Sequence, residues 1–360
     1  MSVLDRAGRP GPTPDAALVA APRAARRRRY GAVLAALVVL VIVVATVSTS
    51  IGDLTVSAPD IVKVLLGDGT RFTDYLVLDI RLPRVVLAVL AGAALALSGA
   101  LFQSLLHNAL ASPDILGISG GASVATVFGT LILGWSGLAL SGLAFAGAVA
   151  VAALIYLLAM SPADGSPAGG RFVLVGIGVA FMVTALLGYV LTRAEVQEAQ
   201  VALAALVGGV DNATWDANLI AAVSLAVLLV ATTFAAPSLR ILQLGDETAN
   251  ALGVPAARRR LTLLTLAVLF AAVGVAAAGP LAFVAFMSAP IARRLVRDGS
   301  PALVPTAFTG ALLVLVADLV AQHFVPGGTR LPAGVLTGAI GAPYLLWLLA
   351  ARSRTSGGPT

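Results

Sequence analysis

The segment LPRVVLAVLAGAALALSGALFQSLL occupies residues 82–106, and its one charged side chain, Arg84, lies next to its start. A helix needs about 20 consecutive apolar residues to cross the hydrocarbon core of a bilayer, and this segment is longer than that. It contains Gly92 and Gly99, and small residues allow helix backbones to approach closely in lipid. The segment therefore predicts a membrane-spanning helix in a tightly packed bundle.

The rest of the chain repeats this pattern. The 360 residues are 59% apolar and 11% charged, whereas soluble domains average about 45–50% apolar and about 25% charged. We therefore expect an all-α integral membrane protein with about ten transmembrane helices. The predicted spans are 31–51, 82–106, 115–133, 138–160, 172–192, 214–236, 258–278, 280–297, 302–324 and 333–351. The fourth of these spans could instead be two short segments, and the break between spans near Gly279-Pro280 could instead be a kink in one helix.

The charges give this bundle an orientation. Cytoplasmic loops of membrane proteins carry an excess of Lys and Arg. With the N-terminus inside and the spans alternating, 17 of the 23 basic side chains lie in the cytoplasm, so both termini are expected there. The six on the outer side are Lys63, Arg71, Arg81, Arg84, Arg193 and Arg330.

The ends of the chain are expected to be tails. Residues 1–30 predict a disordered, basic cytoplasmic tail, residues 31–351 the transmembrane domain, and residues 352–360 a second cytoplasmic tail. A cleaved signal peptide is the competing interpretation of the start. It is disfavoured because the apolar run 31–51 has the length of a full span, not of a 7–15-residue signal core.

Composition excludes several classes of function. Cysteine is absent, and His107 and His323 are the only histidines, so no metal centre or thiol chemistry is expected. Lys63, the only lysine, has no glycine-rich turn before it, so the chain lacks a P-loop for ATP. No catalytic constellation of an intramembrane enzyme is present. The net charge of +6 lies in short segments between apolar runs, which is a topological pattern and not a nucleic-acid surface.

Asp318 is the one clear ionisable residue inside a predicted span. It is interpreted either as a polar contact on a translocation path or with a partner helix, or as an internal hydrogen bond that holds the bundle. A single carboxylate without a relay disfavours ion coupling. The energy for transport is therefore expected to come from a partner protein.

Two segments between spans predict short helices. Residues 52–80, on the outer side, begin one with Ser57 as candidate N-cap and Pro59 in its first turn. Residues 237–257, on the cytoplasmic side, form the other. There Asp246 is a candidate cap, Glu247 complements the helix dipole, Gly253 ends the helix and Pro255 prevents its resumption.

Four ordered stretches resemble one family, the permease subunits of type II ABC importers for iron–siderophore complexes, haem and vitamin B12. One such motif is weak evidence, but the ordered set from about residue 57 to 351 is specific. The stretches are Arg81–Gln103 continuing through His107–Ala122, then Leu244–Pro255, Gly279–Leu295, and Ala317–Thr337 with Ile340–Tyr344.

The resemblance implies a type II ABC importer permease fold and several partners. Two permease chains form the pore, ATP-binding subunits dock inside, and an extracytoplasmic binding protein delivers substrate, all in the bacterial plasma membrane. No cofactor binds this chain directly, because ATP is bound by the partner subunits. The chain itself is therefore not expected to be an enzyme.

The resemblance also implies roles for two groups of residues. Arg81 and Arg84 match outward-facing arginines that meet acidic residues of the binding protein; lipid-headgroup anchoring or a helix-end contact is the alternative. A helix from Gly245 to Pro255 matches the coupling helix that docks in the ATPase, with a passive surface helix as its alternative. The coupling residues are Gly245, Asp246, Glu247, Leu252, Gly253 and Pro255.

The chain departs from the family pattern at two places. Asn108-Ala109-Leu110 replaces a frequent Asn-Pro-Leu, and Ala289-Pro290 lacks a frequent following histidine. These departures leave the substrate open and raise the hypothesis of a mixed pair of permease chains. The expected cargo is a ferric siderophore. A haem or vitamin B12 importer is the alternative within the class, and an ion-coupled secondary transporter the alternative outside it.

Overall fold

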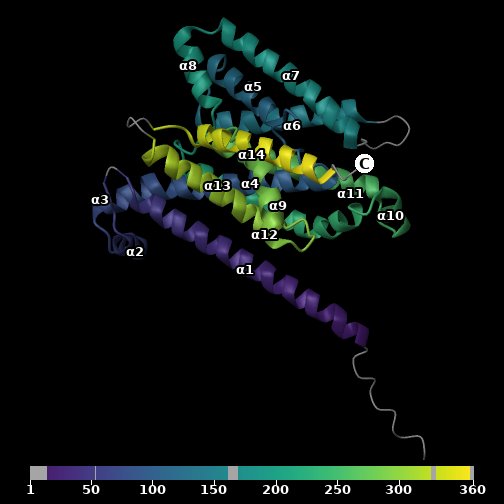
Figure 1. Ribbon diagram of the computed structural model, residues 1–360. Coiled ribbons are helices and arrows are strands. Elements are labelled where there is room, and N and C mark those ends of the chain that lie inside the picture. Colours follow the sequence, from purple (N-terminus) through teal and green to yellow (C-terminus); the bar gives the residue numbers. More distant parts are fainter. Residues whose placement is uncertain (1–13, 53, 161–168, 326–329, 357–360) are drawn as a thin grey trace, which may run out of the picture.

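The structure is a computed structural model that describes residues 14–52, 54–160, 169–325 and 330–356. Every regular element in these ranges is a helix (Figure 1), which confirms the predicted fold class. Each of the ten predicted spans coincides with one helix. These are α1 (Pro14–Ser50), α4 (Leu82–Leu105), α5 (Ile118–Leu131), α6 (Gly137–Ala159), α7 (Gly169–Arg193), α9 (Trp215–Leu242), α11 (Ala256–Ala278), α12 (Val284–Val296), α13 (Leu303–His323) and α14 (Ala333–Ser356).

Eight helices in the described ranges are long and apolar enough to cross a membrane. The remaining two, α5 and α12, have 14 and 13 residues, which is below the length of a full span. The predicted fourth span is one continuous helix, α6. At the predicted break, Gly279 ends α11 with a φ of 69°, and α12 begins only at Val284, so the two helices are separated by a loop.

The helix α4 lies at the centre of the bundle, and α13, α11, α12 and α9 all pack on it. The backbones come very close at two glycines. A Cβ atom at Gly92 would collide with the backbone of Gly310 on α13, and one at Gly99 with the backbone of Ala285 on α12. These glycines therefore permit the close helix packing that the sequence predicted.

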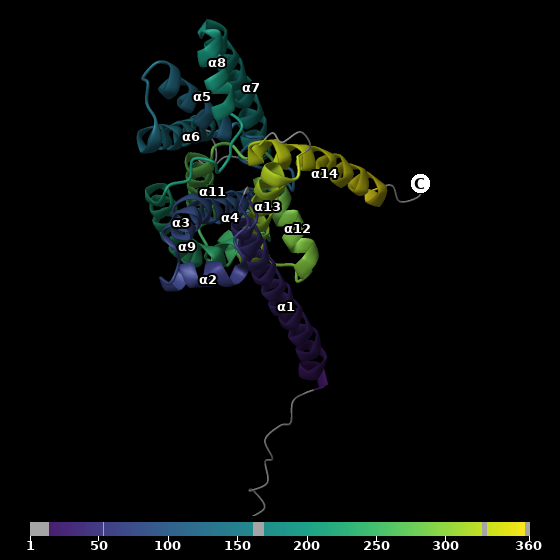
Figure 2. The same cartoon turned by 90° about the vertical axis from the view of Figure 1, so that its left-hand side faces the viewer.

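The helices α5, α6, α7 and α8 (Val196–Ala205) gather on one side of this centre, and α1 lies on the opposite side (Figures 1 and 2). The helix α6 connects the two parts, because it packs on both α5 and α11. The bundle thus has a dense core around α4 and a separate outer layer formed by α5 to α8.

The N-terminal segment differs from the predicted tail. Helix α1 already begins at Pro14, so residues 14–30 are helical where we predicted disorder, while residues 1–13 lie outside the described residues. Alanine and arginine, which dominate residues 14–30, are strong helix formers, and this accounts for the longer helix. At the other end, α14 continues to Ser356, and residues 357–360 lie outside the described residues.

The segment before α4 consists of three short helices: α2 (Ala58–Leu66), α3 (Arg71–Asp74) and a π-helix (Tyr75–Arg81). The Oγ atom of Ser57 accepts a hydrogen bond from the backbone N–H of Asp60 at 3.4 Å, so Ser57 caps α2 as predicted. The Ser57 hydroxyl also donates to the Asp60 carboxylate at 2.6 Å. This bond and the neighbouring Lys63 ammonium lower the pKa of Asp60.

The junction between the π-helix and α4 is held by α9. A π-helix and a proline near a helix start both disturb the regular pattern of backbone bonds. The Trp215 indole donates to the Leu78 carbonyl at 2.9 Å, and the Asn218 amide donates to the Pro83 carbonyl at 2.8 Å. Two side chains from the start of α9 therefore satisfy carbonyls at this junction.

Candidate functional site

The predicted cytoplasmic segment contains a short helix, α10 (Asp246–Ala251), between α9 and α11. Helix α9 continues through Pro237 to Leu242, which leaves only a three-residue link before α10. Gly245 in that link has a φ of 98°, and Gly253 after the helix has a φ of 79°. Both values lie in the region that favours glycine, and Gly253 follows the end of the helix as predicted.

The helix α10 is fixed to the start of α11. The Oδ1 atom of Asn250 accepts a hydrogen bond from the Ala256 N–H at 3.0 Å, and the Val254 N–H donates to the Ala249 carbonyl at 2.9 Å. The Arg260 guanidinium forms an ion pair with Asp246 at 2.7 Å. These three contacts make α10, the turn and the first turns of α11 one unit.

The structure corrects one detail of the prediction. Asp246 does not cap α10, because the N-cap position is occupied by Gly245, which has no side chain that could cap the helix. Asp246 is the first residue of the helix, and its carboxylate is bound by Arg260 instead. Glu247 follows in the first turn, where a negative charge complements the helix dipole.

The solvent-exposed surface of this unit carries apolar side chains. Leu244 is 64% exposed and Leu252 is 61% exposed, and both flank α10. Gly245 and Gly253 have no neighbouring atoms within 4 Å of the position of a Cβ. The two exposed leucines therefore give the unit, which is bonded to the start of α11, an apolar contact surface.

Arg84 and Asp318 meet at the other end of the bundle. The Nε and Nη2 atoms of Arg84 donate to the two carboxylate oxygens of Asp318 at 2.9 and 2.7 Å. Nη2 also lies 2.7 Å from the Asp211 carboxylate, and the Gln322 amide donates to Asp318 at 2.6 Å. The side chain of Asp318 is 4% exposed and that of Arg84 is 17% exposed, so this is a nearly buried charge network between α4 and α13.

Arg81 lies in a separate set of contacts. Its side chain is buried, and its guanidinium donates to the carbonyls of Thr49, Ser50 and Leu54. These carbonyls belong to the end of α1 and the residues that follow it. Arg81 therefore joins the start of α4 to the end of α1, which is the helix-end contact named above as the alternative role for these arginines.

Two members of the Arg84 network, Asp211 and Gln322, were not predicted. Asp211 lies in the loop before α9, and only a three-dimensional structure brings this loop to α4. Gln322 follows Asp318 by one helical turn, a spacing at which side chains meet. The contact between these two residues could therefore have been predicted from the sequence. Within the described ranges, no group of three or more His, Cys, Asp or Glu side chains is arranged to hold a metal ion.

The bundle of long apolar helices defines the class of polytopic membrane proteins. Residues 38–351 match the model of the FecCD transport family. The chain belongs to this family, as its motifs predicted.

Individual relatives agree over most of the chain. The ferric enterobactin transport system permease protein FepG of Escherichia coli K12 is 36% identical over 304 residues, which is 84% of this chain and 91% of the relative. The probable siderophore transport system permease YfhA of Bacillus subtilis 168 is also 36% identical, over 84% of this chain and 90% of its own length. The hemin transport system permease HmuU of Yersinia pestis is 33% identical over 76% of this chain and 82% of its own length.

The fold is also similar to a solved structure. A chain described as an inward-facing metal-chelate type ABC transporter superposes with a TM-score of 0.77 at 25% identity. The superposition covers 89% of this chain and 99% of the other. The arrangement of helices is therefore that of a permease chain of such transporters.

Proposed function

We propose that this chain is the membrane permease subunit of an ATP-driven importer of ferric siderophores. The observation that carries the proposal is the 36% identity to two siderophore permeases, each over 84% of this chain. Permeases named for iron(3+)-hydroxamate and ferric citrate align over similar lengths. Large ferric chelates are therefore the cargo class that the relatives share most often.

Haem import is the second candidate, supported by the 33% identity to a hemin permease. Vitamin B12 stays an alternative from the motif resemblance alone. An ion-coupled secondary transporter is disfavoured, because Arg84 and Gln322 already bind both oxygens of Asp318. A carboxylate held in this way is poorly placed to take up and release a transported proton.

The proposed energy input comes through α10. In this proposal ATP binds to separate partner subunits, which receive the unit from Gly245 to Pro255 in a groove. Leu244 and Leu252 provide apolar contact, and the Asp246–Arg260 pair passes the displacement to α11. The coupling residues are those predicted: Gly245, Asp246, Glu247, Leu252, Gly253 and Pro255.

Two further partners complete the proposal. A second permease chain, identical or different, completes the pore, and an external binding protein docks near Arg81 and Arg84. An acidic side chain of that protein would reach Arg84 by replacing Asp211, whose side chain is 46% exposed. The α10 end and both termini are then cytoplasmic, in agreement with the excess of arginine at that end.

The test is uptake in a strain that lacks this gene, complemented with the wild-type chain. Radiolabelled iron is offered as several ferric siderophores, and labelled haem and cobalamin are offered in parallel. Loss of iron uptake alone, restored by complementation, supports the siderophore proposal and identifies the chelate. Loss of haem or cobalamin uptake alone reassigns the cargo. Iron uptake that persists after deletion of the partner ATPase contradicts the ATP-driven mechanism.

A further inference from the structure

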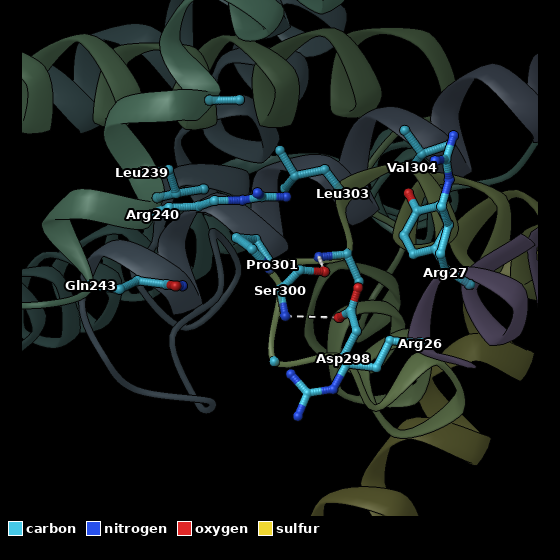
Figure 3. Close-up of a pocket in the computed structure, with 14 residues that line it drawn as sticks. Arg26, Arg27, Leu239, Arg240, Gln243, Asp298, Ser300, Pro301, Leu303 and Val304 are labelled. Atoms are coloured by element: carbon cyan, nitrogen blue, oxygen red, sulfur yellow. Dashed lines mark hydrogen bonds between the residues drawn. The ribbon is translucent and has the colours of Figure 1, made fainter. Parts of the chain in front are cut away.

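A cavity of about 780 Å³ lies at the end of the bundle where α1 begins. Its walls come from three parts of the chain: the first half of α1, the end of α9, and residues 298–304, which join α12 to α13 and begin α13. Figure 3 shows this cavity with Arg240 on one side, Arg26 and Arg27 on the other, and Asp298 and Ser300 between them. The function proposed above does not use this cavity.

The cavity is positively charged. It has the guanidinium groups of Arg26, Arg27 and Arg240 against the single carboxylate of Asp298. None of the ion pairs between described residues involves these three arginines. The Asp298 carboxylate accepts a hydrogen bond from the Ser300 N–H at 2.8 Å, so it supports the loop and does not neutralise an arginine directly. Three guanidinium groups without a carboxylate partner are suited to a phosphate.

The surface beside the cavity is partly apolar. Val304 lines the cavity and is 49% exposed, and Leu229 on α9 is 41% exposed. Leu229 precedes Ala236, which also lines the cavity, by seven residues, so the two lie on one face of α9 at a rise of about 10 Å. A lipid with its acyl chains against Leu229 would have its phosphate at the level of the cavity. Anionic headgroups bind in such basic pockets at the ends of membrane helices.

We propose that this cavity binds the phosphate headgroup of an anionic lipid, with Arg27 and Arg240 as its main ligands and Arg26 at its edge. The bound headgroup would bridge the first half of α1 to the end of α9. The proposal rests on the membrane-spanning arrangement of the helices but not on the transported cargo. A result that removes the siderophore assignment therefore leaves this proposal unchanged.

The experiment uses the full-length chain in a neutral detergent and titrates phosphatidylglycerol, with bound lipid counted by native mass spectrometry. The pocket variant carries Arg27→Gln and Arg240→Gln. The matched control carries Arg258→Gln and Arg259→Gln, which remove the same charge from two exposed arginines at the same end of the bundle. We expect the tightest binding step to weaken by about fivefold per pocket arginine and to be unchanged in the control.

A third variant is designed to strengthen lipid binding instead of weakening it. Asp298→Asn removes the opposing charge but keeps an oxygen that can accept from the Ser300 N–H, so we expect tighter binding of phosphatidylglycerol. This gain also guards against a trivial loss of folding in the pocket variant, since a misfolded chain would not bind more tightly. Elution of each variant as a single peak in size-exclusion chromatography is the accompanying control.

Several outcomes would overturn the proposal. Equal weakening in the pocket and control variants would indicate diffuse surface charge. Displacement of the lipid by inorganic phosphate at equal concentration would assign the cavity to a free anion. Loss of bound lipid on addition of the partner ATPase subunits would assign it to a protein interface. Lipid loss confined to the pocket variant, with gain in Asp298→Asn, supports a lipid site.

Discussion

Arg84 on α4 and Asp318 on α13 form a two-point ion pair, with nitrogen to oxygen distances of 2.9 and 2.7 Å. Asp318 is almost completely buried, and Arg84 has a second carboxylate, Asp211, within 2.7 Å. The pair joins two helices through residues that are 234 positions apart in sequence. Its removal is the most direct test of what holds the core of the bundle together.

Asp318→Asn is expected to destabilise the protein, because Arg84 loses its most buried partner. The cost should be about 2 to 3 kcal/mol, somewhat below the range for a fully broken buried pair, since Asp211 remains beside Arg84. Thermal unfolding of the purified chain in detergent measures it. The double variant Arg84→Met with Asp318→Leu should be less destabilised than Asp318→Asn alone; a double variant that is worse would contradict this account.

Gly99→Ala is expected to disrupt the contact between α4 and α12. The added methyl group collides with the backbone of Ala285, which cannot move away as a flexible side chain can. Overpacking of this kind costs about 1 to 3 kcal/mol, measured as a lower yield of folded protein and a lower unfolding temperature. Gly142→Ala on α6 is the control, because no atom lies within 4 Å of the new methyl group. Equal behaviour of the two variants would refute the packing argument.

Gly253→Val is expected to uncouple ATP hydrolysis from uptake while the protein still inserts and folds. The site is open, so no steric contact is involved, and the effect comes from the φ of 79°. A side chain other than glycine pays about 1 to 2 kcal/mol for this conformation, which reduces the correctly oriented population of α10 by about tenfold. Uptake and ATPase activity are measured together in proteoliposomes that contain the partner subunits.

Gly253→Asn is the matched control for this prediction, since asparagine adopts the left-handed conformation more readily than β-branched residues do. It should keep most of the uptake. If Gly253→Val transports as well as the wild type, then the turn after α10 does not carry the coupling.

Arg81→Glu combined with Arg84→Glu is expected to slow association of the external binding protein by about tenfold at low salt, with a smaller effect at high salt. Surface-capture kinetics give the rate. Because these changes also break internal bonds, Asp211→Asn is the informative second variant: it frees Arg84 for an acidic partner and should speed association. Unchanged kinetics in both variants would reject docking at this surface.

The sequence predicted the helices well because their information is local. An apolar run in lipid has to satisfy its backbone groups internally and therefore forms a helix, and all ten predicted spans coincide with helices. The end of α10 before Gly253 was predictable for the same reason, since a glycine between a short helix and a proline usually ends the helix. Features fixed by a few neighbouring residues were therefore predictable.

Features that depend on partners distant in the sequence were not predictable. Arg293 in the last turn of α12 donates to Ser104 on α4 at 2.8 Å, and no local pattern indicates this contact. Asp246 was expected to cap its helix, but Arg260 binds it instead. Asp211 was not singled out at all, because no local pattern indicates that its loop lies beside Arg84. Each case depends on how helices pack, which composition and periodicity do not determine.

The close approach of Gly92 and Gly310 restricts how the transporter can move. Gly92 follows Arg84 by eight residues and Gly310 precedes Asp318 by eight, so two antiparallel helices are pinned at two levels about 12 Å apart. Helices joined at two levels cannot slide along each other or splay at one end without breaking a contact. The two helices α4 and α13 therefore move as one rigid body. Any opening motion of the transporter must occur at the contacts between this pair and the other helices.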